Sequence, residues 1–257
     1  MKYFPVVLAL ISSSAFAEEY RFVEFSHATY DSDFGMKYDS NALELSIEAV
    51  KNLGFFVSYE RSDGVSYLDT AKMLSKGIDN DATYAETGNT ATITFLDFFK
   101  TEIRMPSDRS YTDSDATLGM RLFNDVSRDS NAYWDLKFHK QSIYNSSGVG
   151  FGTRLGMRFI PFPAVREFKL GAFGDVILTN ISSVKLDTDA DKISLNLNRK
   201  TVGGEAIYIA NKFTFGASVE QNQLVHKFSF KLDSGGNFDE RFNDAYKIGK
   251  IFVQYHF

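Results

Sequence analysis

Alternation between apolar and polar residues recurs along most of the chain and limits its fold more than any other feature. From 43 to 49, leucine, isoleucine and alanine alternate with Glu44, Ser46 and Glu48. The same period of two returns over 53–59, 149–159, 213–219 and 251–257. Successive side chains of a strand point to opposite faces, so this period predicts strands with one apolar face. The chain is therefore expected to be all-β and antiparallel.

The segments between these predicted strands alternate between short and long. Short segments lie near 50–52, 97–100, 124–131, 161–166 and 210–212, and long polar ones near 29–41, 63–89, 107–115, 143–148, 181–192 and 232–244. Transmembrane barrels of the outer membrane have short periplasmic turns and longer external loops. This alternation of connection lengths predicts an up-and-down transmembrane barrel of about 12 strands. Barrels of about 10 to 14 strands also fit, because Gly203 and Gly204 interrupt the alternating pattern of 193–210.

Two soluble folds also produce alternating strands. A β-sandwich does not repeat short and long connections this regularly. A lipocalin-like barrel turns its apolar face inward and is usually smaller than this chain of 257 residues. The connections and the length therefore favour the membrane barrel.

The first 17 residues are predicted to be a secretory signal peptide, which leaves 18–257 for the barrel. Lys2 precedes the short apolar run 3–11, and Ala15, Phe16 and Ala17 form a small-residue cleavage site. A membrane-spanning helix needs about 20 apolar residues, more than this run supplies.

Composition excludes several functional classes. There is no cysteine, so thiolate metal sites and cysteine nucleophiles are absent. The formal net charge is -5, which makes nucleic acid an unsuitable partner. We expect neither a cofactor nor a metal site.

Aromatic side chains gather beside the predicted short turns, as in the interfacial girdle of membrane barrels. They are Phe55, Phe98, Phe99, Tyr133, Trp134, Phe159, Phe162, Phe168, Tyr208, Phe213, Tyr255 and Phe257.

The chain ends in KIFVQYHF, which places Ile251, Val253, Tyr255 and Phe257 on one face. This ending resembles the closing strand of Gram-negative outer-membrane β-barrel proteins, and the lack of a plug-like segment before the first strand resembles small porins. No single family within this class is identified. The resemblance implies recognition of the last strand by the barrel-assembly machinery, help from periplasmic chaperones, and contact with outer-membrane lipid and lipopolysaccharide. It leaves the oligomeric state open.

Charged residues that alternate with the apolar set are expected to face the lumen, because a charge on the lipid face near the midplane costs about 2–4 kcal/mol. The expected basic wall comprises Lys100, Arg104, Arg121, Lys137, Arg154, Arg158 and Lys169. The expected acidic wall comprises Glu44, Glu48 and Glu60. In a ring of about 12 strands these walls would lie opposite each other and set up a field across the pore.

The leading functional hypothesis is a small channel for small solutes, with arginine favouring anionic ones. Two alternatives remain open. Opposed charges could pair and fill a non-conducting structural or surface-interaction barrel. The chain could also be an outer-membrane lipid hydrolase or protease, although His139 shares the inward parity of Asp135 and Lys137, and no suitable nucleophile accompanies it.

Overall fold

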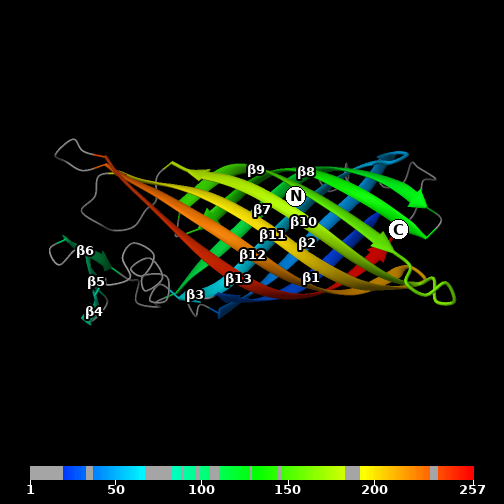
Figure 1. The fold of residues 1–257 in the computed structure, drawn as a ribbon, viewed down its shortest axis with the longest axis horizontal. Coiled ribbons are helices and arrows are strands. Elements are labelled where there is room, and N and C mark those ends of the chain that lie inside the picture. The colour runs from blue at the N-terminus through cyan, green and yellow to red at the C-terminus, as the bar shows by residue number, and fades with distance from the viewer. Residues whose placement is uncertain are drawn as a thin grey trace, which may run out of the picture.

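The computed structural model describes residues 20–32, 37–66, 83–87, 90–95, 99–104, 110–127, 129–143, 146–182, 192–231 and 237–257. Ten strands close into one antiparallel barrel (Figure 1). They are β1 (Phe22–Ser32), β2 (Lys37–Val50), β3 (Leu53–Ser66), β7 (Ser110–Ser127), β8 (Ser130–Ile143), β9 (Ser146–Phe159), β10 (Phe168–Ile181), β11 (Lys192–Ala210), β12 (Phe213–Lys231) and β13 (Asn237–His256). The predicted signal peptide lies outside the described residues.

The expectation of about 12 strands is wrong, and the reason lies between β3 and β7. There β4 (Thr83–Thr87), β5 (Thr90–Phe95) and β6 (Phe99–Arg104) form a separate three-stranded sheet. Of the segment near 97–100, expected to be a barrel turn, Phe99 and Lys100 belong to β6, while 97–98 lie outside the described residues. A strand pattern has the same period in a loop hairpin as in a barrel wall, so the alternation of 90–104 could not separate the two.

Each barrel strand joins its sequence neighbour, except that β3 pairs with β7 and β1 closes the ring against β13. The start of β1, the end of β13 and the connections that join β2 to β3, β7 to β8, β9 to β10 and β11 to β12 lie at one end, which we call the turn end. Asn52 and Asn211 adopt positive φ angles there, of 69° and 56°. Asparagine tolerates this left-handed conformation, which tight turns require. The excursion from β3 to β7 leaves from the opposite loop end (Figure 1).

The barrel is apolar outside and charged inside. Phe151, Val219 and Ile251 are exposed by 68, 71 and 63%, while Glu24 and Asp135 are buried. Among the described residues no helix is long and apolar enough to cross a membrane. The exposed apolar side chains of the strands form an apolar belt.

Strand β11 departs from the rule that apolar residues face outward. Leu195, Leu197 and Ile207 are buried, with exposures of at most 4%, while Val202 and Tyr208 face outward. The expected aromatic girdle needs two corrections. Tyr133 is buried inside the barrel while its neighbour Trp134 is exposed, and Phe99 belongs to β6 of the separate sheet. Phe98 lies outside the described residues. Apolar side chains can enter the lumen at little cost, whereas charges cannot face lipid, so the pattern constrains the two faces unequally.

The closing strand has the face that its sequence predicts. Ile251, Val253 and Tyr255 all point outward from β13, and Phe252, Gln254 and His256 are buried. Phe257 follows the strand, and its backbone N–H donates to the carbonyl of Arg21 at 3.3 Å. The role of this strand in assembly remains a prediction.

Candidate functional site: the charged lumen

Most of the expected site residues lie on inward positions of the barrel. Arg121 is on β7, Lys137 on β8, and Arg154 and Arg158 on β9. Glu44 and Glu48 are on β2, and Glu60 is on β3. Lys169 lies at the start of β10 and lines a cavity at the turn end. The expectation that Lys100 and Arg104 line the lumen is wrong, because both belong to β6, which is not a strand of the barrel wall.

Ion pairs link neighbouring parts of this interior. Arg121 holds Asp135 with two hydrogen bonds, of 2.8 and 2.9 Å, and reaches Glu44 at 3.4 Å. Arg158 contacts Glu205 on β11 at 2.7 Å, and Lys250 on β13 contacts Glu24 at 2.8 Å. Lys137 pairs with Asp175 on β10.

These pairs replace the expected opposed walls with a mixed arrangement. Glu44 lies within reach of Arg121 instead of across the lumen from it, and Asp135, Asp175 and Glu205 stand among the basic residues. The expected walls also omitted Glu24, Asp115, Asp175, Arg199, Glu205, Glu220 and Lys250. The alternation of the sequence could have identified them as inward-facing: Glu24, for example, stands between the apolar residues Val23 and Phe25.

Four inward aromatic rings lie on glycines of the adjacent strand. The cross-strand pairs are Phe56 with Gly119, Tyr133 with Gly156, Phe173 with Gly203, and Phe252 with Gly216. A Cβ on any of these glycines would overlap the ring above it. The absence of a side chain therefore lets each ring lie against the wall instead of standing across the lumen.

A cation covers each of these rings. The guanidinium carbon of Arg154 lies 3.7 Å from the centre of the Phe173 ring, and that of Arg121 lies 4.9 Å from the centre of the Phe56 ring. Arg158 lies over Tyr133 at 5.4 Å, and the ammonium of Lys250 over Phe252 at 5.5 Å. Cation–π attraction thus adds to the ion pairs of Arg121, Arg158 and Lys250, and it also holds Arg154 against the wall.

Gly216→Ala is expected to destabilise the barrel by about 1–3 kcal/mol, because the new methyl group displaces the Phe252 ring. Gly249→Ala on β13 is the matched control, since nothing lies within 4 Å of a Cβ there. Its effect should stay within about 0.5 kcal/mol. Urea unfolding in lipid vesicles measures both, and equal losses would contradict the proposed ring-on-glycine packing.

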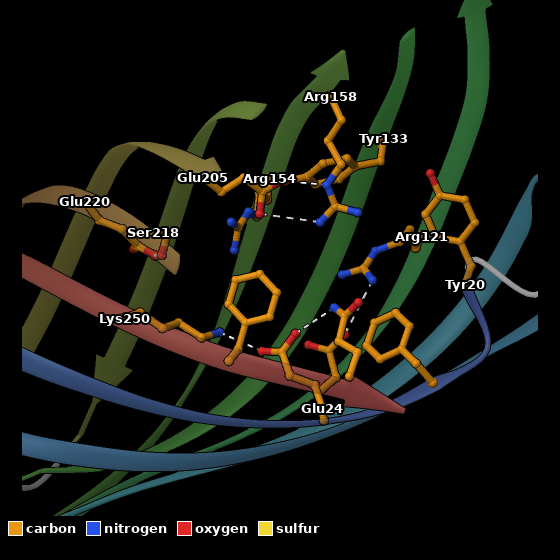
Figure 2. A pocket seen from close by; sticks show the side chains of 14 residues that line it. Tyr20, Glu24, Arg121, Tyr133, Arg154, Arg158, Glu205, Ser218, Glu220 and Lys250 are labelled. Carbon is orange, nitrogen blue, oxygen red and sulfur yellow. Dashed lines mark hydrogen bonds and ion pairs between the residues drawn. The ribbon is translucent and has the colours of Figure 1, made fainter. Parts of the chain in front are cut away.

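Two cavities lie along the lumen, one on each side of a layer of charges. The larger, of about 160 Å³, extends toward the loop end past Tyr30, Ser40 and Glu60. The smaller, of about 60 Å³, extends toward the turn end past Tyr20 and Gln254. The charged layer consists of the six residues that line both: Glu24, Glu44, Arg121, Arg154, Glu220 and Lys250. Figure 2 shows five of them, Glu24, Arg121, Arg154, Glu220 and Lys250, around the smaller space.

An aromatic stack narrows the lumen at the turn end. The Tyr20 ring, just before β1, stacks on Phe123 with the ring centres 3.8 Å apart, and Tyr133 completes this buried cluster. Figure 2 shows Tyr20 beside Arg121 at the edge of the smaller cavity. The chain before the first strand therefore contributes to the lining of the lumen.

One group of side chains has the hydrogen-bond order of a hydrolytic triad. Asp115 contacts His139 Nδ1 at 3.1 Å, and His139 Nε2 lies 3.1 Å from the Thr179 hydroxyl. His139 is only 2% exposed, and neither it nor Thr179 lines one of the two lumen cavities. The Thr179 hydroxyl also donates to Gln141 at 3.2 Å. This arrangement supports a structural histidine. Nor does any group of three or more potential metal ligands occur in the described part of the chain.

A closed barrel with an apolar exterior and a charged interior fits only a membrane that is crossed by strands. The chain is a bacterial outer-membrane β-barrel. No protein-family model matches this outer-membrane barrel, and neither does any curated protein.

Solved structures similar to this outer-membrane barrel include the outer-membrane protease OmpT from Escherichia coli, with 6% identity, 96% of this chain and 99% of that chain covered, and a TM-score of 0.45. The KdgM porin in complex with disordered oligogalacturonate has 10% identity, coverages of 92 and 99%, and a TM-score of 0.41. LpxR from Salmonella typhimurium has 9% identity, coverages of 91 and 100%, and a TM-score of 0.40. At these scores the similarities assign no function.

Proposed function

We propose that this protein is a narrow outer-membrane channel for small polar solutes. The observation that carries the proposal is the pair of cavities placed in series along the lumen, which share a layer of charged side chains. Polar space lies on both sides of this layer, which is the constriction between the two cavities. Rings and ladders of charge are the usual means by which open barrels select solutes.

The selectivity follows from the whole lining instead of from the basic residues alone. Seven carboxylates line the larger cavity: Glu24, Glu44, Glu60, Asp115, Asp135, Asp175 and Glu220. Five cations line it: Arg121, Lys137, Arg154, Arg199 and Lys250. This balance favours small cations weakly over small anions, so it supports a neutral or zwitterionic solute better than the anionic one expected from the sequence.

Single-channel recording of the pure refolded protein in planar bilayers is expected to show small, discrete conductance steps. Tyr20→Ala should raise the step size, because it removes a ring that narrows the turn end. Phe162→Ala is the control, since this ring is exposed in the turn between β9 and β10. Under a salt gradient, Arg154→Gln should move the reversal potential further toward cation preference. A folded protein that gives no defined steps would refute the channel.

A second candidate function is a non-conducting structural barrel. The observation that favours it is the set of ion pairs that bridge non-adjacent strands: Arg121 to Glu44, Lys137 to Asp175, and Arg158 to Glu205. Such pairs brace the wall and reduce the open cross-section. The same recordings distinguish the two functions, because a braced and closed lumen stays silent in the wild type and in the Tyr20→Ala variant.

A further inference from the structure

We propose that the larger lumen cavity is a binding site for a small amino acid, with its carboxylate on Arg154 and Arg199 and its ammonium on Glu220 and Asp175. The inference rests on the proposed function in that the site would lie on the permeation path. It deepens that function by naming the class of solute.

Arg154 and Arg199 differ from the other lumen cations. Both line the larger cavity, and neither forms an ion pair within the described residues. Arg154 Nε is buried and has no hydrogen-bond partner in the part of the chain that the structure describes, while its guanidinium rests on the Phe173 ring. A buried donor without an acceptor is costly, and a carboxylate is the acceptor that suits a guanidinium best.

Acceptors without donors line the same cavity. Asp175 uses one carboxylate oxygen to bind Lys137, while its Oδ1 is buried. Among the residues placed in the structure, neither this atom nor the buried amide oxygen of Asn222 has a hydrogen-bond partner. Within the described residues, the hydrogen bond that Glu220 receives is from the hydroxyl of Ser218, at 3.2 Å. These groups can accept hydrogen bonds from a ligand that donates several, preferably from a positive group.

One small molecule with both kinds of group satisfies the two sets together. Arg154 and Glu220 line both cavities, so they lie at the junction through which a solute would pass (Figure 2). The larger cavity has a volume of about 160 Å³. A cavity of about 150 Å³ accommodates a molecule as large as benzene, so the available volume suits a small amino acid and not an oligomer.

The test is equilibrium dialysis of radiolabelled L-serine against the refolded full chain in detergent micelles, which needs no conductance. L-Serine is expected to bind saturably. Lactate lacks the ammonium and ethanolamine lacks the carboxylate, so each should compete at least about tenfold more weakly than unlabelled L-serine. Equal competition by lactate and L-serine would overturn the zwitterion site, as would the absence of saturable binding.

Variants test the residues individually. Arg154→Gln and Glu220→Gln should each weaken L-serine binding about tenfold or more, because each removes one charge-assisted contact. Arg166→Gln is the control, since Arg166 pairs with Asp129 on the exposed turn end. Heat-dependent gel mobility confirms that each variant is folded, and Arg199→Gln provides a second test if Arg154→Gln fails to fold.

The binding test and the conductance test can give opposite results, so the two proposals can be refuted independently. If L-serine binds to a barrel that shows no conductance, the site stands and the channel is refuted. If the barrel conducts but does not bind L-serine, the channel stands and the site is refuted.

Discussion

Arg121→Met is expected to lower the free energy of unfolding by about 3–5 kcal/mol, because it leaves a buried carboxylate without its partner. Asp135 is only 1% exposed and receives both of its guanidinium hydrogen bonds from Arg121. The same change removes the cation from above the Phe56 ring and the contact with Glu44. Urea unfolding in lipid vesicles, followed by the fluorescence of Trp134, measures the loss.

The double variant Arg121→Met with Asp135→Leu separates charge from packing. It removes both partners of the bidentate pair, and buried pairs replaced by apolar residues of similar size are often tolerated. We expect it to recover much of the lost stability. If the double variant is as unstable as Arg121→Met alone, the uncompensated carboxylate is not the cause.

Leu155→Arg is expected to cost about 2–4 kcal/mol, because Leu155 is 60% exposed near the middle of the outward face of β9. Val149→Arg lies on the same face near the loop end of the strand, where the penalty falls to about 0–1 kcal/mol. Gel mobility of folded and unfolded protein across a urea series measures both variants without involving Trp134, which pairs with Leu155 across the strands. Equal losses of stability in the two variants would contradict the position assigned to the apolar belt.

Residue parity predicts which face a side chain occupies when a charge is involved. Glu24 and Phe25 are adjacent and point to opposite faces, and the same holds for Lys250 and Ile251. Lipid enforces this separation, because a charge on the outer wall is expensive. The class of fold, the apolar belt and most lumen residues therefore follow from the sequence.

Residue parity fails to predict the face of a side chain where the free-energy penalty for the opposite face is small. Leu195, Leu197 and Ile207 enter the lumen because an apolar side chain may lie inside a barrel without leaving a polar group unsatisfied. Nor does parity give the position of a strand around the ring. The placement of Glu44 beside Arg121 depends on β3 pairing directly with β7, and the intervening strands of the loop excursion hid that pairing from the sequence.

The seam between β1 and β13 has a consequence for how the barrel forms. Eleven residues of β1, from Phe22 to Ser32, pair with β13 across a seam that joins the two ends of the chain. Until the last strand arrives, β1 and β12 both present rows of unpaired amide and carbonyl groups, which can template pairing with other chains. A chain that stops before 237 would retain two unpaired strand edges, so the twenty residues of β13 protect the rest of the sheet from aggregation.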